Sequence, residues 1–320
     1  MLSLVIPVYR SAENLPRLFT EIERLAGELP VQLEVVFVVD GSPDNSLQIL
    51  EDRLPRWRLR SQLIELSRNN GSFAAIAAGL AAGRGEWFAV MAADLQEPPA
   101  LVSQFLKVLQ SGEADITFGY RVGRADPLAS RLLSDGFWSL YRRFVVSEMP
   151  KGGIDVFGCT RQVRDELVRM REVNTNLIAQ LLWLGFRRAF VPYERQPRLE
   201  GRSAWTFGRK VRYAVDSVFG FTDLPIRLLL FLGAAGTLAA VVASAVVFTF
   251  WMLGRVPVLG YTPLMLMITF FGGLTALGLG IVGQYLWLTL QNARGRPSYV
   301  IKSAQTFEGD QAFKAARNSA

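Results

Sequence analysis

The stretch LEVVFVVDGS, residues 33–42, decides the fold. It begins as an apolar, β-branched run over Leu33–Val39 and stops at Asp40, Gly41 and Ser42. A run of this length followed by turn-forming residues is typical of a buried strand that ends in a tight turn. The sequence therefore predicts a strand with a carboxylate directly at its end.

The same pattern repeats on both sides of this stretch. Short apolar runs alternate with segments whose apolar residues recur at helical spacing, which indicates an α/β fold with a mostly parallel, doubly wound sheet. Ligands of such sheets bind beyond the carboxyl ends of the strands, where this chain carries Tyr9, Asp40 and Asp94. Strands are predicted over Leu2–Val8, Leu59–Leu66, Trp87–Ala92 and Ile116–Tyr120, and helices over Asn14–Leu29, Asp44–Leu54, Gly71–Gly83 and Pro99–Ser111.

Two long apolar stretches, Leu228–Gly254 and Val256–Ala293, follow the α/β pattern. Each exceeds the roughly 20 residues that a helix needs to cross the hydrocarbon core of a bilayer. Arg255 and turn-forming residues separate them, so they are predicted to form a transmembrane hairpin. The alternative is a pair of buried core helices, but such helices seldom run so long without a polar face.

The net charge of +7 is concentrated around the predicted hairpin. Because Lys and Arg residues flank it on both sides while its connecting loop holds Arg255 alone, the positive-inside rule puts the preceding domain in the cytoplasm. Lipid headgroups and phosphates are simpler partners for these charges than nucleic acid. Aromatic and basic residues near 128–146 and 204–221 predict two amphipathic helices in the membrane interface.

The residue types that are missing restrict the chemistry. The chain has no histidine, which excludes imidazole proton shuttles, Ser-His triads and His-based metal sites. Its single cysteine, Cys159, excludes an internal disulfide and fits a reducing compartment. Any catalysis must therefore use carboxylates, Arg and Lys, hydroxyls and backbone amides.

Several short motifs occur together in one order. They are PVYxxxENL from Pro7, DGSPDNS at Asp40–Ser46, Arg68-Asn69 before a glycine, ADLQEPP at Ala93–Pro99, RxxGxSxW at Arg198–Trp205, and the ending GQYLWLTLQNARGRPSYVI at residues 283–301. In this order the chain resembles family 2 glycosyltransferases, and among them the polyprenyl-phosphate glycosyltransferases similar to dolichol-phosphate-mannose synthase. The resemblance runs from residue 1 to about residue 301.

The resemblance implies a GT-A catalytic domain over 1–222, a transmembrane hairpin over 226–293 and a cytoplasmic tail over 294–320. It implies inverting transfer of one sugar from a nucleotide sugar to a polyprenyl phosphate, undecaprenyl phosphate in a bacterium, by a multi-pass protein of the cytoplasmic membrane. Asp94 and Asp155 would be the catalytic carboxylates. Pro7, Tyr9, Asp40, Arg68, Asp94 and Gln96 would bind the donor, and Arg121, Arg131, Ser134, Arg198 and Ser203 would grip the phosphate groups of the acceptor.

The family also implies a divalent cation, Mg²⁺ or Mn²⁺, at Asp94 and Gln96. Val39 and Ala92 stand where relatives carry further acids, and Arg10-Ser11 replaces a common Asn-Glu pair. Hard cations need several oxygen ligands. The sequence therefore predicts weaker metal binding, or an ion held largely by the donor diphosphate, with Arg10 supplying part of its charge.

The expected acceptor needs little activation. The second pKa of a phosphate monoester is about 6, so its oxygen is already ionised near neutral pH. Orientation by arginines, which grip phosphate bidentately, then matters more than a general base.

Two other functions fit some of the same residues. One is a degenerate transferase that binds a sugar nucleotide or a lipid phosphate and regulates a partner without turnover. The other, a processive polysaccharide synthase, is disfavoured because no QxxRW-like run occurs. The sequence leaves the sugar, the nucleotide base and the oligomeric state open, a homo-oligomer included.

Overall fold

A computed structural model describes residues 1–122, 154–170, 177–196, 224–253 and 261–309. The chain divides into two compact units. The first contains Met1–Lys210 together with Pro297–Ala320, and the second contains Val211–Arg296. We call them the α/β unit and the helical unit.

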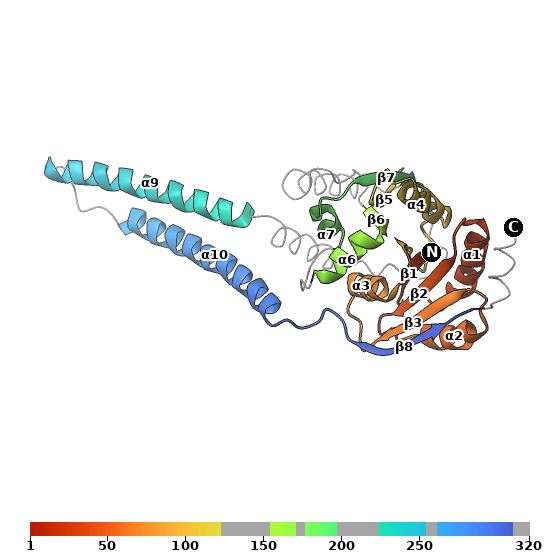
Figure 1. Ribbon diagram of the computed structural model, residues 1–320. Coiled ribbons are helices and arrows are strands. Elements are labelled where there is room, and N and C mark those ends of the chain that lie inside the picture. The colour runs from red at the N-terminus through yellow and green to blue at the C-terminus, as the bar shows by residue number, and fades with distance from the viewer. Residues whose placement is uncertain (123–153, 171–176, 197–223, 254–260, 310–320) are drawn as a thin grey trace. The chain divides into compact units, whose positions relative to one another are not determined.

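An eight-stranded sheet with the order β7-β5-β6-β4-β1-β2-β3-β8 forms the centre of the α/β unit (Figure 1). The neighbours β3, β2, β1 and β4 are parallel, whereas β6 and β8 are antiparallel to the strands beside them. The strands are β1 (Leu2–Val8), β2 (Leu33–Val39), β3 (Arg60–Leu66), β4 (Trp87–Val90), β5 (Ile116–Arg121), β6 (Ile154–Thr160), β7 (Arg188–Tyr193) and β8 (Ile301–Phe307).

Strand β2 shows why the sheet is central. All seven of its residues are buried, because helices cover both faces of the sheet. Val35, Phe37 and Val39 belong to the core cluster on one face, and Val36 and Val38 belong to the cluster on the other.

The helices present one apolar side to these faces. Helix α1 (Leu15–Glu28) buries Leu15, Leu18, Ile22 and Leu25, a spacing that forms one stripe along a helix. The remaining helices of this unit are α2 (Ser46–Arg53), a 3₁₀ turn at Leu54–Arg56, α3 (Ser72–Ala82), α4 (Ala100–Gln110), α6 (Arg161–Arg169) and α7 (Leu177–Trp183).

The chain's only cysteine lies in this core. Cys159 is fully buried in β6, and burial raises the pKa of its thiol to about 12.

The helical unit contains two long helices, α9 (Leu224–Met252) and α10 (Tyr261–Ala293). Within α10, Phe270–Ala293 is long and apolar enough to cross a membrane by length and composition, and among the described residues it is the one helix that meets this criterion. The second span of the predicted hairpin, which would lie in α9, remains a prediction.

The predicted strands over 2–8, 33–39, 59–66, 87–92 and 116–120 correspond to β1 to β5, and the four predicted helices correspond to α1 to α4. The α/β fold with a mostly parallel sheet is therefore confirmed. The predicted interface helices near 128–146 and 204–221 lie outside the described residues. Strand β8 differs from the prediction of a tail over 294–320, because its mostly exposed residues give no apolar pattern.

Candidate active site

The candidate site lies at one edge of the sheet, where β1, β2 and β4 end. Val8 pairs with Val39 and Val5 with Val90, so these three strands end side by side. The chain leaves them through Tyr9, Asp40 and Ala93–Gln96 respectively. The polar residues that the sequence predicts at strand ends are thus brought to the same edge. We call it the carboxyl edge.

The loop after β1 is held by the carboxylate of Asp44. Asp44 accepts hydrogen bonds from the backbone N–H of Ala12 at 3.0 Å, from Ser42 Oγ at 2.6 Å and from Ser46 Oγ at 2.9 Å. Partial burial opposes ionisation of Asp44, but these hydrogen bonds outweigh it and lower its pKa. The DGSPDNS run therefore fastens the end of β2 to the end of β1.

Arg10 has an unusual backbone. Its φ of 51° lies in the left-handed region, which is unfavourable for a residue with a side chain. A hydrogen bond from its N–H to Ser42 Oγ at 2.7 Å helps to hold this conformation. Its guanidinium carbon lies 5.5 Å from the centre of the Tyr9 ring. Arg10 is exposed and follows the end of β1, so its positive charge lies at the carboxyl edge.

Asp40 organises a second loop. It is 3% exposed and accepts hydrogen bonds from the backbone N–H groups of Asn70 at 2.7 Å and Gly71 at 2.8 Å. Burial raises the pKa of Asp40, although these two hydrogen bonds favour its ionised form. We call Arg68–Gly71 the 68–71 loop. Asp40 was predicted to bind the donor, and its observed contacts hold this loop against the end of β2.

Gly41 allows the 68–71 loop to come close. Its φ is +55°, and a Cβ at this position would lie 2.5 Å from the backbone carbon of Arg68 and 2.5 Å from the backbone nitrogen of Asn69. Only glycine fits a backbone approach of this kind.

The segment after β4 carries Asp94, Leu95 and Gln96. Leu95 has a φ of 54°, and the N–H of Gln96 donates to Asp94 Oδ1 at 3.3 Å. Gln96 Oε1 accepts a hydrogen bond from the guanidinium of Arg195, and its carbonyl accepts one from the N–H of Gln196 at 2.9 Å. The segment after β7 is thereby tied to the Asp94 segment.

The motifs do not predict the contact between Arg195 and Gln96. The signal of Arg195 in the sequence is its position three residues before Arg198, the first residue of the RxxGxSxW run.

The described residues do not fit a complete ligand set for a metal ion. No group of three or more histidine, cysteine or acidic side chains suited to hold a metal occurs among them. Of the predicted pair, Gln96 Oε1 accepts a hydrogen bond from Arg195, so a cation at this oxygen would lie beside a guanidinium. A divalent cation needs several oxygen ligands. The metal site at Asp94 and Gln96 stays a prediction.

A cavity of about 490 Å³ lies beyond Gln96, between the start of α4 and the segment after β7. Arg195 lines it, but none of the residues predicted for the site does. Its lining residues are Pro98, Ala100, Leu101, Gln104, Pro192, Tyr193, Glu194, Arg195 and Gln196.

The other predicted residues fall into two groups. Pro7 lies in β1, Arg68 is exposed in its loop, and Arg121 ends β5 at the carboxyl edge. Asp155 lies at the start of the antiparallel β6, so its backbone is at the same edge, but its side chain is outside the described residues. Arg131, Ser134, Arg198 and Ser203 also lie outside the described residues.

One departure from the family pattern has a clear structural context. Val39, which replaces an expected acid, is 1% exposed and packs in the core cluster that contains Phe37. An ionised side chain would be costly at this position.

Comparison with known proteins identifies the family. The model of glycosyl transferase family 2 matches residues 3–169. An uncharacterised glycosyltransferase of Synechocystis is 30% identical over 302 residues, which cover 94% of each chain. The bactoprenol glucosyl transferase of Shigella phage SfII is 26% identical over 305 residues, covering 95% of this chain and 98% of the relative.

Solved structures are similar at a lower level. A mannosyltransferase of Pyrobaculum calidifontis, PcManGT, solved with GDP-Man and Mn²⁺, has a TM-score of 0.44 and 16% identity, covering 89% of this chain and 87% of its own. At this level the similarity gives no information on the ligand of the present chain.

The family model covers more than half of the chain, and the order of motifs along the sequence agrees with it. The chain therefore belongs to glycosyl transferase family 2, and it is a glycosyltransferase.

Proposed function

We propose that the protein transfers a single sugar from a nucleotide sugar to a polyprenyl phosphate, with inversion at the anomeric carbon. In a bacterium the acceptor is undecaprenyl phosphate. The reaction takes place at the cytoplasmic face of the cell membrane and supplies a lipid-linked sugar for glycosylation of the cell envelope.

The observation that carries this proposal is the gathering of the motif residues at the carboxyl edge. Arg10, Asp40 with the 68–71 loop, and Asp94 with Gln96 come from three adjacent strands of a family 2 fold. Relatives that align with almost the whole chain include proteins named bactoprenol glucosyl transferase. Bactoprenol is a polyprenol, so their names support a lipid acceptor.

The donor would bind along this edge. The Asp44 contacts and the Asp40 contacts keep two loops in place before any ligand arrives, which lowers the conformational entropy lost on binding. The leaving nucleoside diphosphate gains negative charge as the glycosidic bond breaks. Arg10 and Arg195 bring positive charge to this edge, where it stabilises that product.

The acceptor brings its own nucleophile. A phosphate monoester oxygen, ionised near neutral pH, attacks the anomeric carbon from the face opposite the diphosphate, and the bond to the diphosphate breaks. This in-line displacement inverts the anomeric configuration. Arg121 at the end of β5, with Arg131, Arg198, Ser134 and Ser203, would orient the acceptor phosphate.

The helical unit would hold the protein at the membrane. Phe270–Ala293 has the length and composition of a membrane span. In α9, the large apolar side chains of Leu228, Leu230 and Phe231 are more than half exposed. Lipid would cover such side chains, and a hairpin of α9 and α10 would return the chain to the cytoplasmic side.

The test is a product analysis. Membranes containing the protein are incubated with a panel of nucleotide sugars, and lipid extracts are analysed by mass spectrometry. We expect one polyprenyl-phosphate hexose whose formation requires the protein, with inverted anomeric configuration by NMR. If no nucleotide sugar yields a lipid-linked sugar, or if the product carries a second phosphate from the donor, the proposal is wrong.

A further inference from the structure

After α10 the chain returns to the α/β unit, and the residues that follow α10 contact a loop of the candidate donor site. We call Tyr299–Glu308 the return segment. It contains β8, which pairs antiparallel with β3 at the edge of the sheet, as Figure 1 shows. Most of its side chains are exposed, so the ladder and a few contacts at its two ends hold it in place.

The first end of the return segment contacts the residues that lead into the 68–71 loop. The backbone N–H of Ser67 donates to the carbonyl of Val300 at 2.9 Å. Glu65 accepts from Lys302 Nζ at 2.7 Å and from Ser303 Oγ at 3.2 Å. Glu65 and Ser67 lie two residues apart directly before the loop. The return segment therefore holds the residues directly before the 68–71 loop by hydrogen bonds.

An irregularity and an aromatic side chain strengthen this end. The register shifts between Glu65 and Leu66, which pair with Ser303 and Ile301. Such bulges redirect side chains. Tyr299 is half-buried and packs against the core cluster that contains Leu66.

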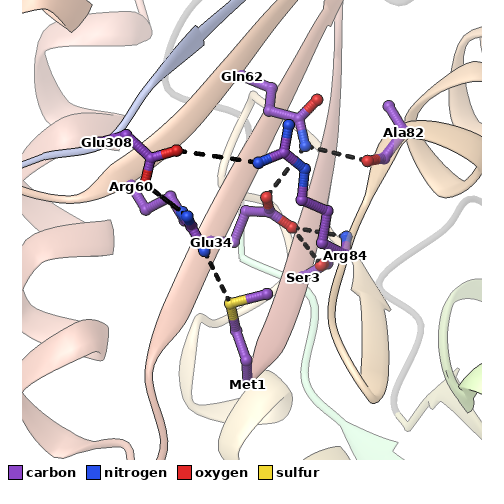
Figure 2. Close-up of polar contacts among 8 residues, drawn as sticks. All are labelled: Met1, Ser3, Glu34, Arg60, Gln62, Ala82, Arg84 and Glu308. Atoms are coloured by element: carbon purple, nitrogen blue, oxygen red, sulfur yellow. Dashed lines mark hydrogen bonds and ion pairs between the residues drawn. The ribbon is translucent and has the colours of Figure 1, made fainter.

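The other end of the return segment is held at the amino ends of the strands, on the side of the sheet opposite to the carboxyl edge. Glu308 accepts from Arg60 Nε at 3.0 Å and lies 3.9 Å from Arg84 Nη1 (Figure 2). Phe307 is half-buried against the other core cluster. These contacts lie beside Glu34 at the beginning of β2, far along the sheet from the 68–71 loop.

The 68–71 loop has few contacts of its own. Ser67, Arg68 and Asn69 are exposed. The described hydrogen bonds that join the loop to the rest of the fold lie at its end, from the N–H groups of Asn70 and Gly71 to Asp40 and from the N–H of Ala75 in α3 to the carbonyl of Gly71 at 3.1 Å. The return segment supplies the anchor at the start of the loop, and Asp40 and the first turn of α3 supply the anchors at its end. A loop that loses the anchor at its start must be ordered again when a ligand binds, which weakens affinity.

We propose that Tyr299–Ser303 position the 68–71 loop for donor binding, so that the chain leaving α10 helps to set the affinity for the nucleotide. These residues are positioning residues. Val300, Lys302 and Ser303 act through Glu65 and Ser67, whereas Tyr299 acts by packing against the core cluster that contains Leu66. The inference rests on the proposed function in one respect, namely that the ligand of the loop is a sugar nucleotide.

The two ends of the return segment provide a matched comparison. Tyr299→Ala removes a half-buried aromatic ring from the first end, and Phe307→Ala removes one from the second. We expect Tyr299→Ala to speed hydrogen exchange at the amides of Asn70 and Gly71 in the full-length protein in detergent. Phe307→Ala should leave exchange at these amides unchanged. Both alanine variants should lower Tm by a similar amount, because each removes a half-buried aromatic ring. Tyr299→Phe, which keeps the packing, should restore slow exchange.

Nucleotide binding is measured on the same variants with UDP and GDP as probes. For the probe that binds the unaltered protein, we expect Tyr299→Ala to raise Kd about tenfold and Phe307→Ala to change it less than twofold. The KM for the donor should rise in the same ratio with little change in the KM for the lipid. A second pair, Lys302→Ala against Glu308→Ala, should follow the same order with smaller effects, because exposed ion pairs contribute little.

The inference is wrong if the two alanine variants change loop exchange equally, or if neither changes it. This outcome does not depend on the ligand. If neither UDP nor GDP binds the unaltered protein while loop exchange still responds to Tyr299→Ala alone, the positioning role stands and the proposed donor is wrong.

Discussion

Strand β2 has a buried carboxylate near each end, and the two are used differently. Glu34, near its beginning, is 0% exposed and accepts from Ser3 Oγ at 2.6 Å, Gln62 Nε2 at 3.0 Å and the N–H of Arg84 at 2.8 Å (Figure 2). Asp40, just beyond the end of β2, accepts hydrogen bonds from two backbone N–H groups of the 68–71 loop.

The difference lies in what each carboxylate joins. Glu34 joins β2 to its two neighbouring strands, β1 through Ser3 and β3 through Gln62, and to the loop between α3 and β4 through Arg84. Asp40 holds an exposed loop at the edge where the donor is proposed to bind. We infer that the amino edge of the sheet serves stability and the carboxyl edge serves activity. Four predictions test this division, from the largest expected effect to the smallest.

Removing the carboxylate of Asp94 should abolish activity without unfolding the protein. We expect Asp94→Ala to lower kcat at least about a hundredfold, since charged groups at a transfer site contribute on this scale. Tm should change little, because Asp94 is only half-buried. Radiolabelled sugar in lipid extracts measures turnover. Asp115→Ala, which removes an exposed ion pair with Arg187 at the amino edge, is the control and should keep full activity. Equal turnover in both variants would remove Asp94 from the site.

Removing Glu34 should do the reverse. Glu34→Ala removes the acceptor of the buried Ser3 hydroxyl and of the part-buried N–H of Arg84, and one of the two acceptors of Gln62 Nε2, which also donates to the carbonyl of Ala82. This loss costs about 3 kcal/mol or more. The corresponding fall in Tm is about 6–12 °C. Thermal unfolding in detergent measures it, and Glu34→Gln, which keeps one carbonyl acceptor, should lose less. The KM for the donor, assayed well below Tm, should stay within twofold of the unaltered value. A large change in this KM with an unchanged Tm would contradict the division between the two edges.

Gly41→Ala should weaken donor binding through the backbone. The new Cβ would lie 2.5 Å from backbone atoms of Arg68 and Asn69, so the 68–71 loop must move. We expect the KM for the donor to rise about tenfold. Gly112→Ala is the matched control, since Gly112 also has a positive φ of 71° but has nothing within 4 Å of its Cβ position. It should lose a little stability from strain alone and keep its KM.

The smallest effect is expected in the pH dependence of stability. The pKa of Asp44 is lowered in the folded protein, so its ionised form stabilises the fold above the ordinary value of 3.8, and this contribution is lost as the pH falls through the lowered pKa. Asp44→Asn should therefore become less stable relative to the unaltered protein as the pH rises. The pKa of Asp40 is raised, so the sign reverses, and Asp40→Asn should become relatively more stable as the pH rises. Tm between pH 3 and pH 7 checks both, and slopes of equal sign would contradict these assignments.

The sequence predicts the strands of the first half of the chain well. Runs such as Leu2–Val8 and Leu33–Val39 are buried on both faces, so nearly every residue contributes to an apolar signal. Strand β8 has no such signal, because its residues Ile301–Phe307 are mostly exposed and its pairing depends on backbone hydrogen bonds with β3. An edge strand of this kind cannot be recognised from hydrophobic periodicity.

The site shows the same limit. Motif residues such as Asp40 and Asp94 can be located from the sequence, because they follow apolar runs. The partners of Asp40 are the backbone N–H groups of Asn70 and Gly71. Because nearly every residue has such a group, the residue types in the sequence do not indicate this contact. The contact between Arg195 and Gln96 joins segments about a hundred residues apart, which spacing along the chain does not reveal.

The position of β8 also determines when the sheet is completed. Ribosomes release a chain from its N-terminus, and domains generally begin to fold in that order. The strand that covers β3 is made only after α9 and α10 have been synthesised. Until then, the outer side of β3 presents unpaired N–H and C=O groups to solvent, where another nascent chain could pair with them. The sheet of the α/β unit can therefore be completed only after α9 and α10 have been translated.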